Sequence, residues 1–405
     1  MTGARLAALA LHGGPPVRRE PMPARRALGP AERAAIEAAL DECQASGREL
    51  GYQGPQEEAY TAAFVAYQGV PGHADAVATG TAGLYVALAA LQLPRGSHVL
   101  VSPVTDPGTL NAVVLNGLVP VLVDAQPGSY LMGAEQAAAR LTPAARALLV
   151  VHANGLAAPM GPLLELAARH GLRVVEDCSQ AHGASLDGRK VGTFGDLAVF
   201  STMFSKNHAT GGCGGVIYTR DLALHRLARA HADRGKPFWD PAFTDRDPST
   251  YLFPALNLNL DELSCAIGRA SLARLDEVRT SRIAFAARLR AALEGRSRAC
   301  APEPVPESAS PFFQVVAFDA TRLRCDKATF AAALAAEGIP VRGHYPQVAA
   351  EWRYLRPHLS DGFACPNAVA RRDAVFHLPF NENHGDREAA DIAAAIEKIE
   401  RAYAP

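Results

Sequence analysis

Apolar residues form two alternating patterns along the middle of the chain. Short β-branched runs, apolar at consecutive positions, are typical of strands buried on both faces of a parallel sheet. Such strands are expected at 98–102, 119–123, 147–152, 173–176, 197–200 and 215–218. Apolar residues at helical spacing lie between them, over 83–91, 109–116, 132–140 and 162–170. Strands separated by helices need crossover connections, so the pattern predicts an α/β fold with a mostly parallel sheet.

The last third of the chain has a different organisation. A long helical pattern covers 260–293, with a bend expected within it, and a Pro-rich connector follows at 301–306. We expect a strand at 312–318 and helices at 327–337 and 386–401. We therefore predict a large domain over residues 15–260 and a smaller α+β domain over 261–405.

Composition limits the classes of partner. The 405 residues carry 40 Lys and Arg against 41 Asp and Glu, a net charge of −1. Without a basic excess or stripe, binding to nucleic acid is not expected. No apolar stretch reaches about 18 residues, so we expect no membrane span. The apolar run 6–11 is too short for a secretory signal, and we expect a cytoplasmic protein.

Cysteine and histidine spacing argues against a metal or disulfide framework. The seven cysteines are scattered, odd in number and without a Cys-x-x-Cys pair. The thirteen histidines show no His-Glu-x-x-His or His-x-His spacing. We therefore expect no bound metal and a reducing compartment.

Three short segments carry candidate chemistry. The first, 78–83, is a small-residue turn at the start of a predicted helix, where free N–H groups and threonine hydroxyls could hold a phosphate. An ordinary threonine N-cap explains the same residues. The second, 174–184, places Glu176 and Asp177 at the carboxyl edge of the sheet, where α/β proteins bind ligands. The alternative is that Asp177 only caps the next turn.

The third segment contains a lysine in an unusual place. Lys206 follows the predicted strand 197–200 and precedes the glycine-rich stretch 211–215. A lysine at the end of a core strand is costly unless it is paired or used covalently, although it could also extend from a loop into solvent. A phosphate cradle, an acid and a lysine amine are together what pyridoxal phosphate requires for its phosphate, its pyridine nitrogen and its aldehyde.

The order of these residues resembles that of the DegT/DnrJ/EryC1/StrS family of sugar aminotransferases, which share the fold type of aspartate aminotransferase. The matching residues are Glu176, Asp177, Gln180, His182, Gly183, Ala184, Gly188, Gly192, Gly195, Asp196, Phe200, Ser201, Lys206, Gly214 and Gly215. Further matches lie at 11–16, 51–55, 257–263 and 344–346. The likeness therefore extends over nearly the whole chain.

The resemblance implies a pyridoxal 5'-phosphate cofactor and a role for each matching residue. Lys206 would bond to the cofactor aldehyde and then move the proton between substrate and cofactor carbons. Asp177 would pair with the pyridinium nitrogen, and Gln180 would lie against the ring. The residues that would hold the phosphate are Gly80, Thr81, Ala82 and Ser201.

Other roles implied by the resemblance depend on an assembly or a substrate. Asn257 would reach the phosphate of the neighbouring subunit, because active sites of the family are shared across a homodimer. His344 would lie near the sugar. His182 is interpreted as a packed histidine behind the cofactor.

The chain departs from the family at three places. The stretch Gly211–Gly215 lacks the glutamate that the family usually carries and has one extra residue. Asn259 stands where an arginine is common, and Asp106 replaces the aromatic residue that stacks on the cofactor ring. These changes bear on the choice of amino donor and acceptor.

The resemblance implies an aminotransferase of sugar or secondary-metabolite biosynthesis. It would move an amino group from glutamate or glutamine to a nucleotide-linked keto sugar or to a keto cyclitol. One alternative is a deoxysugar dehydratase of the same fold; relatives that dehydrate replace the lysine by histidine, and His208 is near Lys206. Another is a non-catalytic, pyridoxal phosphate-binding regulatory protein. A nucleotide-binding Rossmann enzyme is disfavoured, since Gly-x-Gly-x-x-Gly is missing after the first strand.

Overall fold

A computed structural model describes residues 2–405, which form two compact units. The large unit contains residues 27–276 and 347–368, and the small unit contains 2–26, 277–346 and 369–405. The predicted domains, 15–260 and 261–405, are continuous in sequence, whereas both units gather separate stretches of chain. The N-terminal segment contributes to the small unit, and residues 347–368 return to the large one.

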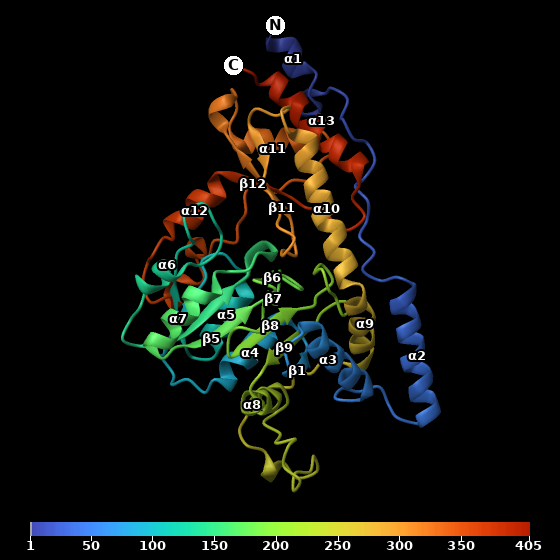
Figure 1. The fold of residues 1–405 in the computed structure, drawn as a ribbon, viewed down its shortest axis with the longest axis vertical. Helices are drawn as coiled ribbons and strands as arrows, with labels where there is room; N and C mark the ends of the chain where they lie inside the picture. The colour runs from blue at the N-terminus through green and yellow to red at the C-terminus, as the bar shows by residue number, and fades with distance from the viewer. Residues whose placement is uncertain (1) are drawn as a thin grey trace. The chain divides into compact units, whose positions relative to one another are not determined.

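The large unit is built around a sheet with the strand order β1-β9-β8-β5-β4-β2-β3 (Figure 1). The strands are β1 (His73–Val77), β2 (His98–Val101), β3 (Val119–Leu122), β4 (Ala145–Val151), β5 (Arg173–Asp177), β8 (Leu197–Ser201) and β9 (Gly215–Thr219). The pairs from β3 to β8 are parallel, and β9 is antiparallel to both of its neighbours. A short hairpin pairs β6 (Ser185–Leu186) with β7 (Arg189–Lys190). The predicted α/β class with a mostly parallel sheet is confirmed.

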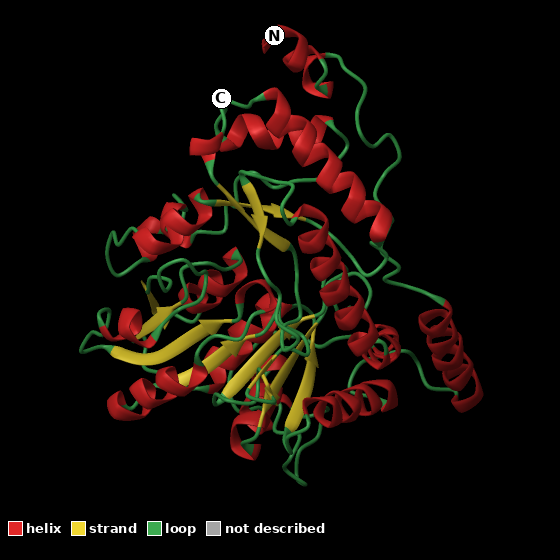
Figure 2. Cartoon of the chain, turned by 45° about the horizontal axis from the view of Figure 1, so that its top comes forward, coloured by secondary structure: helices red, strands yellow, loops and turns green. Residues whose placement is uncertain are grey.

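Helices cover both faces of this sheet (Figure 2). They are α3 (Pro55–Gln68), α4 (Gly80–Ala90), α5 (Pro107–Leu115), α6 (Ala134–Ala138), α7 (Met160–His170), α8 (Leu222–Ala232) and α9 (Glu262–Ala273). Helix α2 (Pro30–Ser46) packs against α9 instead. Phe200 of β8 packs in one core cluster with Phe64 of α3. On the opposite face, Val199 lies so close to Gly83 of α4 that an added Cβ would come within 2.7 Å of it. Burial on both sides explains why the apolar positions of β8 are consecutive.

The small unit has an antiparallel sheet of its own, in the order β10-β11-β12. Its strands are β10 (Cys300–Pro302), β11 (Gln314–Phe318) and β12 (Val375–Leu378). Its helices are α1 (Thr2–Ala7), α10 (Leu275–Leu293) from Glu277 on, α11 (Lys327–Ala336), α12 (Pro366–Asp373) from Val369 on, and α13 (Asp386–Ala402). Leu9, Phe285, Phe330 and Ile396 share its apolar core. The helical pattern predicted over 260–293 is interrupted at Arg274.

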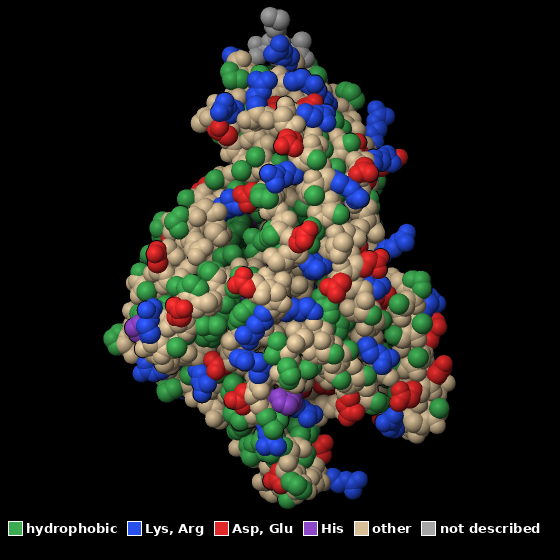
Figure 3. Space-filling model, viewed as in Figure 1, with side chains coloured by type: hydrophobic (Ala, Val, Ile, Leu, Met, Phe, Trp, Pro, Cys, Tyr) green, Lys and Arg blue, Asp and Glu red, His purple; other side chains and the backbone are tan. Residues whose placement is uncertain are grey.

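Within the described chain, no helix is both long enough and apolar enough to cross a bilayer. Side chains of both charges are interspersed on the face drawn in Figure 3.

Strand β1 lacks the run of consecutive apolar residues that predicted the other strands, because it buries a carboxyl group. Asp75 in its middle is buried, as is Glu57 of α3. Burial, reinforced by the charge of Asp75, raises the pKa of Glu57 to about 8. Burial likewise raises the pKa of Asp75 to about 6, although Arg229 opposes the rise, and Asp233 adds to it. The folded protein therefore holds a proton on Glu57 at pH values where the unfolded chain has lost it.

We predict that Glu57→Gln stabilises the protein at alkaline pH. Because the pKa of Glu57 is higher in the folded state, this group costs stability as pH rises from about 4.5 towards about 8. Glutamine cannot ionise and can still accept the 2.8 Å hydrogen bond that Gln53 N donates to Glu57 Oε2. We expect a gain on the order of 4 kcal/mol at pH 8 that shrinks towards pH 5, because each tenfold change in proton affinity corresponds to about 1.4 kcal/mol and the pKa rises from 4.5 to about 8.

Denaturant unfolding at pH 5 and pH 8 measures this difference. Glu58→Gln changes the exposed neighbour on the same helix and should leave the stability at both pH values unchanged. An equal effect of Glu57→Gln at the two pH values would contradict the pKa of Glu57.

Candidate active site

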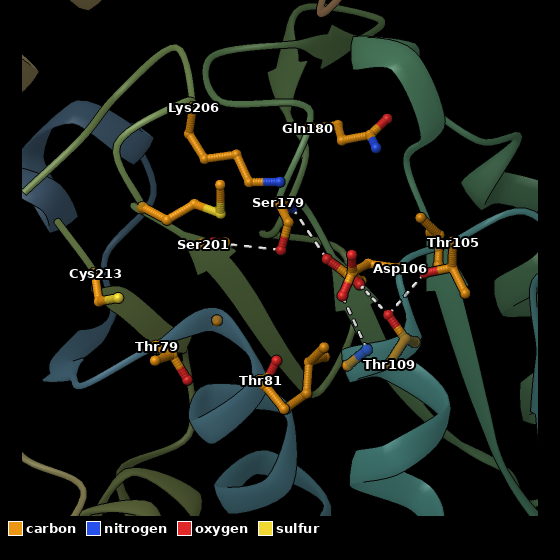
Figure 4. Close-up of a pocket in the computed structure, with 16 residues that line it drawn as sticks. Thr79, Thr81, Thr105, Asp106, Thr109, Ser179, Gln180, Ser201, Lys206 and Cys213 are labelled. Carbon is orange, nitrogen blue, oxygen red and sulfur yellow. Dashed lines mark hydrogen bonds between the residues drawn. The ribbon is translucent and has the colours of Figure 1, made fainter. Parts of the chain in front are cut away.

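The candidate residues meet in a cavity of about 410 Å³ in the large unit, at the carboxyl ends of the parallel strands (Figure 4). Six of the predicted residues line it: Gly80, Thr81, Asp177, Gln180, Ser201 and Lys206. Figure 4 shows Lys206 extending into the cavity from one wall, with Thr105, Asp106 and Thr109 on the opposite wall. The volume lies within the usual range for cofactor sites.

The start of α4 and the end of β8 form a cradle for an anion. Gly80 and Thr81 stand in the first turn of α4, where backbone N–H groups have no acceptor within the helix. A Cβ at Gly80 would come within 2.5 Å of Ser201 Cβ, so the helix start and the Ser201 side chain are in close contact. The amide of Ala82 instead donates to Thr79 Oγ1 at 2.9 Å, so the threonine N-cap is present and the Ala82 amide, which was predicted to hold the phosphate, is already used within the helix start. A phosphate group fits this cradle.

We predict that Gly80→Ala weakens cofactor binding about tenfold. The added methyl group cannot share its position with Ser201, so the helix start and the strand end must move apart and spread the phosphate donors. Titration of the apoprotein with pyridoxal phosphate, followed by absorbance, measures the dissociation constant. Gly161→Ala, at the start of α7 with nothing within 4 Å of the added Cβ, is the matched control. Equal affinities of the two variants would argue against the cradle.

Asp177 is held in place by three neighbouring groups. It is the last residue of β5 and is buried. Thr109 Oγ1 donates to Asp177 Oδ2 at 2.8 Å, and Ser179 N donates to Oδ1 at 3.0 Å. Thr105 Oγ1 lies 2.7 Å from Thr109 Oγ1 and orients it. A buried carboxylate fixed in this way can face a protonated ring nitrogen. The hydrogen bond from Ser179 N also shows that Asp177 caps the next turn, which was the alternative interpretation of this residue.

Glu176 points to the other side of β5 and has a structural role. Its carboxylate accepts the amides of Gly192, Phe194 and Gly195 at 2.7–2.8 Å. Burial alone would raise the pKa of Glu176, but the hydrogen bond from His152 and these amides hold it below its usual value. Because side chains alternate along β5, the Asp177 carboxylate faces the cavity, whereas the Glu176 carboxylate faces the opposite side and anchors a loop.

His152, Glu176 and Cys178 lie close enough together to resemble a metal site. His152 Nδ1 accepts the amide of Ala158 at 3.0 Å, so the ring proton is on Nε2, which donates to Glu176 at 2.9 Å. Burial raises the pKa of the Cys178 thiol well above its usual value. The ligand atoms of His152 and Glu176 are therefore used within this network.

Lys206 is held in a closed loop between β8 and β9. Two hydrogen bonds between Thr202 and Thr210 close the loop: Thr210 N donates to Thr202 O at 2.9 Å, and the two hydroxyl oxygens lie 2.8 Å apart. The Lys206 side chain is only 9% exposed, which does not fit a lysine that extends into solvent. Burial lowers the pKa of Lys206, while Asp177 and Asp106 oppose this. An amine that is easily deprotonated is a competent nucleophile and base.

The altered glycine-rich turn completes the cavity wall. Gly211 has a φ of 111°, a backbone conformation suited to glycine. Cys213 is exposed and lines the cavity, within the stretch that lacks the glutamate usual in the family.

Three predicted residues do not line the cavity within this chain: Ala82, Asn257 and His344. Asn257 is exposed and accepts a 2.7 Å hydrogen bond from Asn259, and its predicted contact belongs to a second subunit. His344 is exposed and belongs to the small unit. His182 is buried against Phe200, as a packed histidine should be.

The sequence interpretation missed residues on the wall formed by α5. Thr109 and Gly108 of α5 line the cavity, as does Ser179 after β5, but none was assigned a role. The available signal for Thr109 was its place in the first turn of a helix that begins at the ligand-binding edge of the sheet.

Comparisons with known proteins agree with this geometry. Residues 30–397 match the DegT/DnrJ/EryC1/StrS aminotransferase family. A UDP-N-acetyl-3-dehydro-alpha-D-glucosamine 3-aminotransferase from Acidithiobacillus ferrooxidans is 33% identical over 86% of this chain and 89% of the relative. An L-glutamine:2-deoxy-scyllo-inosose aminotransferase from Micromonospora echinospora is 35% identical, covering 69% of this chain and 67% of the relative.

A solved structure confirms the fold over the whole length. The crystal structure of DesI in the presence of its TDP-sugar product has a TM-score of 0.83 and 25% identity, over 98% of this chain and 97% of that one. The predicted family, aminotransferase activity and cofactor are thereby confirmed. The chain belongs to the DegT/DnrJ/EryC1/StrS aminotransferase family and is a pyridoxal phosphate-dependent aminotransferase.

Proposed function

We propose that the protein transfers an amino group from glutamate or glutamine to the ketone of a sugar or a cyclitol. The observation that carries this proposal is the meeting of Lys206 and Asp177 in one cavity beside a phosphate cradle. The names of the relatives support both acceptor classes, since one acts on a nucleotide-linked sugar and another on a cyclitol.

Bound pyridoxal phosphate supplies an electron sink for the substrate carbon. Lys206 would hold the cofactor through its aldehyde and, once the amino donor takes that place, would carry the proton to and from the substrate carbon. Its burial favours the neutral amine that this proton transfer needs. Asp177, fixed by Thr109 and Ser179, would keep a proton on the ring nitrogen.

The dehydratase alternative finds less support. His208 does not line the cavity, among the residues described, because its ring lies in the core, 2.6 Å from Tyr60 OH and 3.2 Å from Ser271 Oγ. Lys206 keeps the position that relatives of the dehydratase type give to a histidine. The regulatory-protein alternative rests on two departures from the family, the altered turn 211–215 and Asp106. Neither departure removes the Lys206 amine or the Asp177 carboxylate from the cavity.

We also propose a cytoplasmic homodimer with shared active sites, acting on small molecules rather than on nucleic acid or a membrane. Exposed apolar side chains lie close to Asn257 in the sequence, with Leu252 50% and Leu256 56% exposed. Tyr52 hydrogen-bonds with Arg234, whose amide donates to Leu256 O at 2.9 Å. A second subunit would cover such side chains. The free thiols of the described cysteines suit a reducing compartment.

A two-step spectral assay tests the proposed function. Glutamate or glutamine should bleach the visible band of the cofactor-loaded protein, and a suitable ketone should restore it. The acceptor panel contains 2-deoxy-scyllo-inosose and nucleotide-linked keto sugars, with 2-oxo acids as the donor-side control. A band that no amino donor changes would support the regulatory protein instead.

A further inference from the structure

Asp106 places a second carboxylate on the cavity wall, apart from the one that faces the cofactor. It is the N-cap of α5, and its Oδ1 accepts the amide of Gly108 at 2.9 Å. In the described chain, no hydrogen bond of the protein engages Asp106 Oδ2. One oxygen thus fixes the carboxylate, and the other is available to a ligand in the cavity (Figure 4).

The charges of the cavity favour a cationic ligand at this point. Among the lining residues of the described chain, Lys206 is the sole cation, and Asp106 and Asp177 are the carboxylates. Lys206 and Asp177 are both committed to the cofactor by the proposed function. Asp106 is exposed, so a ligand that enters the cavity can reach its free carboxylate oxygen, and the two carboxylates of the wall outnumber its one cation.

The segment 347–368 brings a polar side chain to helix α5, which Asp106 caps. Tyr354 is 51% exposed, and its hydroxyl donates to Asn111 Oδ1 of α5 at 3.1 Å. Burial and the charge of Asp106 raise the pKa of Tyr354. The segment is tied to the strand end before α5, since Thr105 N donates to Gln347 O at 3.1 Å. Polar groups next to a carboxylate suit a polyhydroxylated ring.

We propose that Asp106 selects an acceptor that already carries a protonated amine, namely a keto cyclitol or keto sugar with an ammonium group. The ammonium group would bind Asp106 Oδ2, while the ketone faces Lys206. This inference rests on the proposed function. A nucleotide-linked acceptor would bring phosphates towards this carboxylate, and a neutral polyol would gain only an uncharged hydrogen bond.

Binding to the donor-treated holoenzyme tests the inference without requiring turnover. The probes are an aminocyclitol and the cyclitol with a hydroxyl group in place of the amine, measured by calorimetry at pH 7. We expect the wild type to bind the aminocyclitol at least tenfold more tightly than the polyol. Asp106→Asn should abolish this preference, because asparagine keeps the N-cap and removes the charge. Asp221→Asn, at the N-cap of α8, should keep it.

The outcomes separate this inference from the proposed function. A wild type without preference, or an Asp106→Asn variant that retains it, would overturn the role of Asp106. In a parallel turnover assay, Asp106→Asn should raise the KM for an amine-bearing ketone at least tenfold more than it changes the KM for the hydroxyl analogue. Equal changes for both ketones would also overturn the inference. Failure of the wild type to use any sugar or cyclitol ketone would instead refute the proposed function.

Discussion

Lys206→Ala should lose the visible band of the bound cofactor and lower turnover by at least about 10⁴-fold. The variant lacks both the amine that holds the aldehyde and the group that carries the proton, and proton transfer alone contributes roughly 10²–10⁴-fold. The loop keeps its backbone bonds between Thr202 and Thr210, so we expect the fold to persist. Absorbance, single-turnover kinetics and circular dichroism measure these three effects.

The control for this variant is another lysine of the same unit. Lys190 contacts Tyr67 and does not line the cavity among the described residues, so Lys190→Ala should keep the band and the turnover. Added methylamine should partly restore turnover to Lys206→Ala by replacing the missing base. Turnover of Lys206→Ala at the wild-type rate would refute the assignment of this residue.

Asp177→Asn should slow the half-reaction with the amino donor about 100-fold while the cofactor stays bound. Asparagine still accepts from Ser179 N but carries no charge, so the ring nitrogen loses its proton and withdraws electrons poorly. The loss of one preorganised electrostatic partner is typically worth 10²–10³-fold in rate. Stopped-flow absorbance after mixing with glutamate measures the rate.

Glu176→Gln provides a matched control, because it removes the charge of the adjacent carboxylate on the other side of β5. This variant disturbs the amides of Gly192 and Gly195 and should lower the melting temperature more than it lowers the rate. An unchanged donor half-reaction in Asp177→Asn would contradict the role of Asp177, and so would equal rate losses in both variants.

The sequence predicted the elements that bury apolar side chains on both sides. The run at 147–152 indicated β4 within two residues of its observed start and one of its end, because a short run of consecutive apolar, β-branched positions favours a strand covered on both faces. Strand β1 was missed because Asp75 interrupts the pattern; the buried carboxylate forms an ion pair with Arg229, which is distant in sequence. Helix α3 was missed along with it.

The sequence predicted the site residues whose type the cofactor chemistry requires. It did not predict the residues that reach the cavity only through the packing of elements distant in sequence. Lys206 and Asp177 follow from what the cofactor requires, and the resemblance supplied their order. The contacts of Thr109 and Ser179 with Asp177 depend on how α5 meets β5, which no local pattern states. Asp106 was expected only as a missing aromatic residue, whereas the structure places it at an N-cap and on the cavity wall.

The most direct test of the central claim identifies the residue that holds the cofactor. The holoenzyme is reduced with borohydride, digested and examined by mass spectrometry. We predict that the peptide containing Lys206 carries the reduced pyridoxyl phosphate group. A label on any other lysine, or an unlabelled protein after full reconstitution with pyridoxal phosphate, would contradict the account.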